Sequence, residues 1–141
     1  MDAIVKKLPV KSGTKGKAIN TNLFFDTGSP RTFVREDTAR KLGNIVQLPN
    51  VIEFRGLSNG EFDTDKGLIL FIKLDGIWCE QFAYVVKNEI IEDEILVGYD
   101  FMQVYKVKLD LDKEDLILDE KQLRRAQKIY LCRNTQTFGI M

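Results

Sequence analysis

The chain has 141 residues, the length of one ordinary domain. Its 21 basic and 21 acidic residues balance to a net charge of zero, so charge gives no reason to expect a nucleic-acid partner. The chain contains no histidine, which excludes Ser-His-Asp triads, Cys-His dyads and histidine-ligated zinc sites. Acid–base chemistry would have to come from carboxylates, lysine, tyrosine or a bound metal.

Signals for membranes and secretion are absent from the sequence pattern. No apolar run approaches the ~20 residues of a membrane helix, and the first ten residues lack the apolar core of a secretory signal. Cys79 and Cys132 do not make a disulfide framework, so we expect reduced thiols, a cytoplasmic location and no membrane partner. We expect the lysine-rich start to be a solvated arm rather than a nucleic-acid site. Its lysines are Lys6, Lys7, Lys11, Lys15 and Lys17.

Short strands separated by turns are predicted along most of the chain. Asn-Gly at 59–60 and Asp-Gly at 75–76 lie between flanking strand-like runs, the strongest short-range signal of a hairpin. Residues 105–111 alternate apolar and charged side chains, as a half-buried strand does. The strands are expected at residues 3–10, 18–25, 33–34, 95–98, 105–111 and 116–118, and the hairpins at residues 51–62 and 67–86.

Helices are predicted at three places. Residues 35–42 have acidic side chains in the first turn and basic ones in the last, which suits a helix dipole. A short helical turn is expected at 99–104. Asp119, followed three residues later by Gln122, resembles a capping box and predicts an amphipathic helix over 119–131. The last ten residues would be an edge strand or loose. The sum is a mostly-β domain, a small barrel-like fold with short helices.

The segment with the most chemical content is Asp26-Thr27-Gly28-Ser29, directly after an apolar strand. A carboxylate in that place is costly unless it is hydrogen-bonded. Gly28 lets the backbone fold back towards it, so backbone N–H groups and the Ser29 hydroxyl can point at the carboxylate. Asp-Thr-Gly is also ordinary turn chemistry, so the tripeptide alone leaves a catalytic role and a structural role both open.

Together with the elements that follow it, this segment resembles the retropepsin-like aspartic peptidases, the group of retroviral proteases and their cellular and bacterial relatives. The segment matches the Asp-Thr/Ser-Gly-Ser/Ala motif of that family. Leu96, Val97 and Gly98 match the hydrophobic-hydrophobic-Gly element that packs beside the catalytic loop, continued by the Gly-x-Asp-Phe form of cellular relatives. The resemblance implies a closed acid-protease barrel with a flap hairpin and a homodimeric assembly.

The hairpins of the chain fit the same order. The hairpin at 51–62 stands where the family has its flap, and residues 107–118 resemble its closing hairpin. The resemblance thus covers roughly residues 3–118, and we take residues 1–118 as the peptidase domain. Residues 119–141 form a C-terminal helix and tail without a firm counterpart, and whether they contact the dimer is open.

The function that the resemblance implies is an aspartic endopeptidase, acting on a peptide or protein substrate through water activated by two carboxylates. The chain has one Asp-Thr-Gly, so the second carboxylate would be Asp26 of a second copy in a C2 homodimer. Thr27 would brace the two loops and Gly28 would contact the substrate backbone. Ser29 would donate to the carboxylate and favour its ionisation, which predicts an acidic optimum. No cofactor and no metal are implied.

Alternatives stay open both for the flap and for the function. The flap would close over the substrate, whereas the other interpretation of the same residues is a rigid surface hairpin. The residues of the predicted flap that would contact the substrate are Gly56, Leu57, Ser58, Asn59 and Gly60. For the function, the alternatives are a catalytically weak domain for dimerisation or peptide binding, and an enzyme that processes only its own precursor.

Departures from the viral pattern are concentrated beside the motif. Pro30 and Tyr99 replace both partners of a charged contact that is common in viral members. Arg31 and Asp100 would either form a replacement pair or face solvent. The acidic run at 92–94 is expected to be a solvated loop, with a metal site as the less favoured interpretation.

Overall fold

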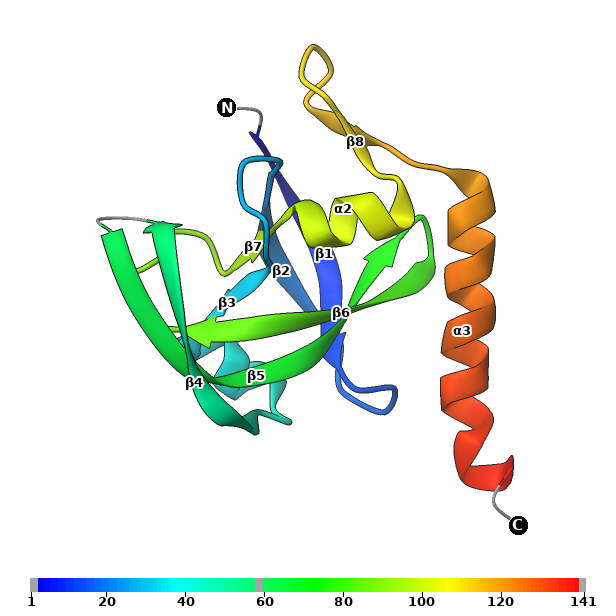
Figure 1. Cartoon of the computed structure of the whole chain (residues 1–141). Helices are drawn as coiled ribbons and strands as arrows, with labels where there is room; N and C mark the ends of the chain where they lie inside the picture. The colour runs from blue at the N-terminus through cyan, green and yellow to red at the C-terminus, as the bar shows by residue number, and fades with distance from the viewer. Residues whose placement is uncertain (1–2, 58–59, 140–141) are drawn as a thin grey trace.

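The computed structural model describes residues 3–57 and 60–139 (Figure 1). The strands in this part of the chain are β1 Ala3–Ser12, β2 Ile19–Asp26, β3 Phe33–Arg35, β4 Val46–Leu57, β5 Gly60–Leu74, β6 Ile77–Val86, β7 Ile95–Val97, β8 Lys108–Asp110 and β9 Asp115–Ile117. The helices are α1 Glu36–Leu42, α2 Tyr99–Tyr105 and α3 Glu120–Gly139.

Six strands close into a barrel. They follow one another in the order β1-β2-β7-β3-β6-β5, and β1 pairs with β5 to complete the ring. β4 pairs with β5 outside this ring, and β8 and β9 form a separate two-stranded sheet. The predicted fold class, a small closed β-barrel with short helices, is confirmed. Closure removes the open sheet edges that would otherwise present unpaired backbone groups.

The short strand β7 decides where the candidate site lies. It runs parallel to β2, where Leu23 pairs with Ile95 and Phe25 with Val97, and antiparallel to β3. Parallel strands end at the same edge of a sheet. The residue that ends β2, Asp26, and the residue that follows β7, Gly98, therefore come to the same edge of the barrel.

Two groups of buried side chains fill the molecule. The larger lies inside the barrel and includes Phe25 and Phe101, both with no exposed surface. The smaller lies where the β4–β5 hairpin leaves the barrel and centres on Phe33 and Leu96. Burial of this apolar area is the main force that holds the strands together.

The predicted strand at 105–111 is confirmed only at Lys108–Asp110 and is wrong for the rest of its length. Tyr105 ends α2, and it packs four residues after Phe101 with its ring centroid 4.7 Å away. The Tyr105 hydroxyl also donates to the carbonyl of Glu80. This buried helical pair outweighs the period-two pattern, so only Lys108–Asp110 is extended and Leu111 is 48% exposed.

The C-terminal helix begins where it was predicted and continues further. The Asp119 carboxylate accepts a 3.0 Å bond from the N–H of Gln122, as a helix cap does. The helix then runs to Gly139 instead of ending near residue 131, so up to that residue the chain forms neither the edge strand nor the loose end that were expected as alternatives. None of the described helices is long and apolar enough to cross a membrane.

Helix α3 packs against the barrel wall. Leu123 and Ala126 are both 4% exposed and belong to the main core. Figure 1 shows the helix beside the barrel, with its C-terminal end far from the N-terminus of the chain. The division of the chain near residue 118 stays a prediction.

A buried lysine fastens α3 in place, which corrects the expectation of a solvated lysine-rich arm. Lys11 is only 7% exposed. Its ammonium donates to the carbonyl of Thr14 and to the hydroxyl of Tyr130, and it lies 4.6 Å from the centre of the Trp78 ring. Aromatic faces and two acceptors together offset the cost of taking this charge out of water.

Replacing Lys11 by methionine is expected to lower the free energy of unfolding by about 1–2 kcal/mol, because it removes two charge-assisted hydrogen bonds and a cation–π contact. Urea unfolding at one fixed protein concentration measures this. The matched control is Lys7→Met on the exposed side of β1, which should stay within ~0.5 kcal/mol of the parent. Equal losses in both variants would contradict the anchoring role.

Candidate active site

Asp26 ends β2 as a nearly buried carboxylate, with 7% of its surface exposed. The N–H of Gly28 donates to its Oδ1 at 2.8 Å, and the N–H of Ser29 donates to its main-chain carbonyl at 3.2 Å. The backbone therefore folds back onto the aspartate directly after the strand. The Gly28 donor stabilises a carboxylate that has little contact with water.

The Ser29 hydroxyl does not donate to Asp26, contrary to the expectation. It donates to the carbonyl of Arg31 at 2.8 Å. A serine hydroxyl has a single hydrogen, so it cannot also donate to the carboxylate. The side chain thus bonds within the turn that follows it, and the contribution of Ser29 to an acidic optimum stays a prediction.

Gly98 presses against the loop that carries Asp26. A Cβ atom at this position would lie 2.2 Å from the carbonyl oxygen of Arg31 and 2.7 Å from that of Ser29. The next N–H, of Tyr99, donates to the Ser29 carbonyl at 2.6 Å. Leu96 and Val97 are buried just before this contact. The structure thus brings the two predicted segments, residues 26–29 and 96–98, into direct contact.

Thr27 and Gly28 lie on the exposed side of the loop. Ala3, at the start of β1, pairs with Asp26, so the chain start lies beside the same loop. The loop is thus buried on the side of Asp26 and Ser29 and open on the side of Thr27. An approaching molecule would meet Thr27 and Gly28 first.

Asp100 fulfils neither of its two expected roles. Arg31 is exposed, and within residues 3–57 and 60–139 Asp100 takes part in no ion pair. Its carboxylate instead accepts hydrogen bonds from Thr32 and Gln81. Sequence reasoning did not identify Thr32 or Gln81, because neither stands in a motif and each lies far from Asp100 along the chain.

The predicted flap is the outer part of the β4–β5 hairpin. Gly56 and Gly60 have φ angles of 97° and 116°, a region that favours glycine. Ser58 and Asn59 lie outside the described residues. The movement of this hairpin over a substrate stays a prediction.

Three aromatic rings hold the base of this hairpin to the barrel. Phe54 and Phe62 face each other across β4 and β5, with ring centroids 5.4 Å apart. Both contact Phe33 of β3, at 5.0 and 5.6 Å between centroids. Edge-to-face pairs of this kind add to the burial of the rings. Motion of the hairpin would therefore be confined to the part beyond the two phenylalanines.

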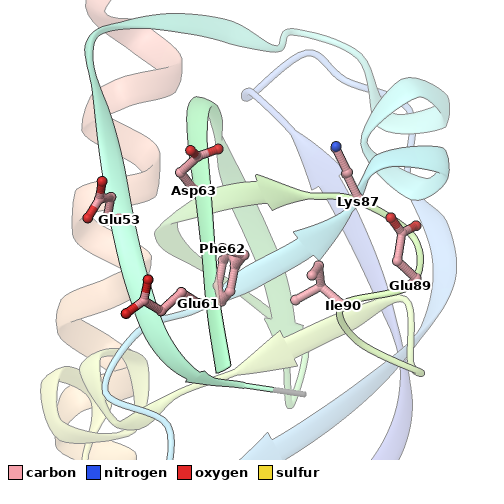
Figure 2. Close-up of a pocket in the computed structure, with 7 residues that line it drawn as sticks. All are labelled: Glu53, Glu61, Phe62, Asp63, Lys87, Glu89 and Ile90. Carbon is pink, nitrogen blue, oxygen red and sulfur yellow. The ribbon is translucent and has the colours of Figure 1, made fainter. Parts of the chain in front are cut away.

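A pocket of about 440 Å³ opens between this hairpin and the segment that follows β6 (Figure 2). Phe62 and Ile90 point into it from opposite sides. Its rim carries four carboxylates and one ammonium, those of Glu53, Glu61, Asp63, Glu89 and Lys87. None of its lining residues belongs to the Asp26 loop, so the pocket flanks the hairpin and not the catalytic candidate.

The acidic run at 92–94 is held to the barrel in part. Glu94 accepts a 2.9 Å bond from the N–H of Asn22. The pKa of Asp93 is raised, first by burial and then by the neighbouring charge of Glu92. In the part of the chain that the structure describes, no three histidine, cysteine or acidic side chains are grouped as metal ligands.

Cys79 is unsuited to act as a nucleophile. It has no exposed surface, and burial raises the pKa of its thiol to about 12. At pH 8, roughly one molecule in 10⁴ would carry the thiolate.

A thiol-reactive probe at pH 8 is therefore expected to label native protein rapidly at the exposed Cys132 only, and at Cys79 only after unfolding in urea. Mass spectrometry of the labelled peptides measures both rates. Cys132→Ser should abolish the rapid phase. Rapid labelling of Cys79 in that variant would show that the barrel wall is open at this point.

Comparisons with known proteins agree with this arrangement. The model of a family described as aspartyl protease matches residues 10–101, from β1 to the start of α2. No curated protein sequence matches the chain. Among solved structures, the retroviral protease-like domain of Ddi1 from Leishmania major is similar, with a TM-score of 0.57 and 15% identity over 84% of this chain and 86% of that one. EIAV protease in complex with the inhibitor HBY-793 is also similar, with a TM-score of 0.56 and 18% identity over 75% of this chain and 92% of that one. The chain therefore belongs to the aspartyl protease family and has a retropepsin-like fold.

Proposed function

We propose that this chain is an aspartic endopeptidase that works as a homodimer, with the two Asp26 carboxylates facing one water molecule. The observation that carries the proposal is the Asp26 carboxylate, 7% exposed and bound by the N–H of Gly28 at the end of β2. It stands in the one Asp-Thr-Gly of a chain that belongs to the aspartyl protease family.

A second copy is needed because one carboxylate cannot act as acid and base at once. A C2 axis beside the loop would bring the same residue to the site from both sides. Exposed apolar side chains next to the loop support this. Val5, two residues along β1 from the partner of Asp26, is 52% exposed, and Tyr99, whose N–H bonds the Ser29 carbonyl, is 51% exposed. Such side chains are suited to an interface.

The proposed chemistry follows from placing two carboxylates about 3 Å apart, where both cannot easily ionise and the pair shares one proton. The ionised carboxylate takes a proton from the water, whose oxygen then bonds to the scissile carbonyl carbon. The protonated carboxylate gives its proton to the carbonyl oxygen. When the tetrahedral intermediate collapses, the C–N bond breaks and the protonated carboxyl gives its proton to the leaving nitrogen, while the ionised carboxylate takes a proton from one hydroxyl of the intermediate, so that the pair again holds one proton. The apparent pKa values belong to the pair and not to either subunit.

A substrate is proposed to lie extended between the loop and the β4–β5 hairpin. The glycines at 56 and 60 allow the hairpin to bend outside its aromatic base, and closure would exclude water from the reaction. The aromatic pairs of Phe33 with Phe54 and Phe62 support a fixed base from which the outer part moves.

The proposal is tested by incubating the protein with a pool of unfolded polypeptides from pH 3 to 7, at two enzyme concentrations about tenfold apart. Cleavage is expected below neutral pH, because one carboxyl of the pair must keep its proton. Activity should rise more steeply than linearly with enzyme concentration while the dimer is still forming. Peptide products identified by mass spectrometry would give the cleavage sites.

Absence of cleavage in a sample that sedimentation shows to be dimeric would contradict the proposal. The chain would then be a retropepsin-like domain for dimerisation or peptide binding. Binding of extended peptides without cleavage, measured by fluorescence anisotropy, would identify that function.

A further inference from the structure

The carboxylate of Asp100 is fixed by four hydrogen bonds. Thr32 supplies two of them, from its N–H to Oδ2 at 3.2 Å and from its hydroxyl to Oδ1 at 2.7 Å. The amide of Gln81 donates to Oδ2 at 3.0 Å, and the N–H of Phe101 donates to Oδ1 at 2.8 Å. Charge-assisted hydrogen bonds are stronger and shorter than neutral ones, so this carboxylate is held firmly although it forms no ion pair within residues 3–57 and 60–139.

Thr32 links the fixed carboxylate of Asp100 to Gly98 by hydrogen bonds. Its side chain has no exposed surface, and its hydroxyl oxygen accepts the N–H of Gly98 at 3.1 Å while its hydrogen goes to Asp100. The hydroxyl therefore has a donor on one side and an acceptor on the other, which sets its orientation. Valine has the same shape without the hydroxyl and would leave the buried N–H of Gly98 without this acceptor.

The loop from Asp26 to Thr32 is thereby held at three points. Strand β2 holds Asp26, the N–H of Tyr99 holds the Ser29 carbonyl, and Asp100 holds Thr32. Tyr99 and Asp100 belong to the first turn of α2. This one turn therefore bonds the loop both at Ser29 and at Thr32. Movement of this turn would move Asp26.

We propose that Thr32 and Asp100 are positioning residues for catalysis, which set the place of Asp26 through Gly98 and the Ser29 carbonyl. This inference rests on the proposed peptidase function. Because both subunits of a C2 dimer carry the same loop, a shift of the loop changes the separation of the two carboxylates from both sides. Proton sharing needs that separation to stay close to 3 Å. Thr32 and Gln81, both neutral, thus contact Asp100 beside the motif, where many viral members have a pair of charged side chains.

The test compares Thr32→Val with Thr32→Ser, which keeps the hydroxyl. Thr32→Val is expected to lower kcat on the order of 10- to 100-fold with KM changed less than about twofold, because the loop is misplaced while the substrate surface is intact. Thr32→Ser should recover kcat to within about threefold. The matched control is Thr21→Val, another threonine without exposed surface, whose hydroxyl donates to the carbonyl of Ile19 within its own strand. It should keep the parent kcat.

A second readout does not depend on activity. Amide hydrogen exchange at Gly98, measured by NMR, should become about tenfold or more faster in Thr32→Val and stay unchanged in Thr32→Ser and Thr21→Val. If Thr32→Val does not fold, Asp100→Ala takes its place, since alanine removes both oxygens that accept from Thr32 and Gln81.

The outcomes separate the two proposals. A parent protein that cleaves nothing overturns the peptidase function, while exchange at Gly98 still reports whether Thr32 fixes this residue. A parent that cleaves, with Thr32→Val at the same kcat or with unchanged exchange at Gly98, overturns the positioning role and leaves the peptidase function standing. A loss of kcat that Thr32→Ser fails to recover also overturns it.

Discussion

Replacing Asp26 by asparagine is expected to lower kcat/KM by at least about 10³-fold and to leave the fold intact. Asparagine can neither take a proton from water nor share one with a second carboxyl, so both acid and base functions are lost. Its amide oxygen can still accept the N–H of Gly28, which keeps the turn after β2 in place. Peptide cleavage measures the first effect and thermal unfolding the second.

The control for this variant is Asp75→Asn. Asp75 lies exposed in the β5–β6 turn with a φ angle of 47°, a conformation that asparagine adopts readily. Its activity should equal that of the parent. If Asp26→Asn kept a tenth or more of the parent activity while Asp75→Asn was unaffected, the Asp26 carboxylate would not be the catalytic group.

Replacing Gly98 by alanine is expected to have the largest effect on stability. The added Cβ would meet the Arg31 carbonyl oxygen at 2.2 Å and the Ser29 carbonyl oxygen at 2.7 Å, both of them backbone atoms that cannot rotate away. The φ angle of Gly98 is −94°, so the cost is steric contact and not backbone strain. Overpacking of this kind costs about 3 kcal/mol. The Asp26 loop would have to move to make room, so turnover should fall as well.

Gly76→Ala separates this contact from a general cost of losing glycine. Gly76 has a φ angle of 80° and open space where a Cβ would lie, so alanine there should cost only about 1 kcal/mol and leave turnover unchanged. Urea unfolding and peptide cleavage give both quantities. A Gly98→Ala variant that was as stable as Gly76→Ala would contradict the close contact between β7 and the loop.

Short sequence patterns correctly predicted the turns and helix ends that are determined by residues close together in the chain. The Asp-Gly pair at 75–76 lies at the turn of the β5–β6 hairpin, where both residues have positive φ. Glu36–Leu42 has the charge order of a short helix, and Asp119 caps α3. Each of these features is decided within a few residues of sequence, and for this reason sequence alone was sufficient.

The strand predicted at 105–111 was too long because two patterns overlap there. Tyr105, Val107, Leu109 and Leu111 alternate at period two, but Phe101 and Tyr105 also stand one helical turn apart. The structure buries the helical pair in the barrel and leaves Leu111 exposed. The choice depends on which side chains find a buried partner, and that partner, the carbonyl of Glu80, lies 25 residues away.

The contacts that fix the candidate site also join distant residues. Thr32 and Asp100 are separated by 68 positions, and Lys11 and Tyr130 by 119. Neither pair stands in a motif that links its two members. Strand order sets both contacts: β7 lies between β2 and β3, and β1 closes the barrel on β5. The motifs thus predicted Asp26 and the packing of residues 96–98 beside its loop, whereas the contacts of Asp100 with Thr32 and Gln81 required the fold.

Each active site is proposed to contain Asp26 from two subunits, and mixing of subunits tests this directly. Parent protein and Asp26→Asn are combined at a fixed total concentration, allowed to exchange subunits, and assayed at several ratios. If mixed dimers are inactive, activity follows the square of the parent fraction, and an equal mixture keeps about a quarter of the parent activity. Activity that falls in simple proportion, to about a half in the equal mixture, would mean that one subunit is sufficient and would contradict the shared site.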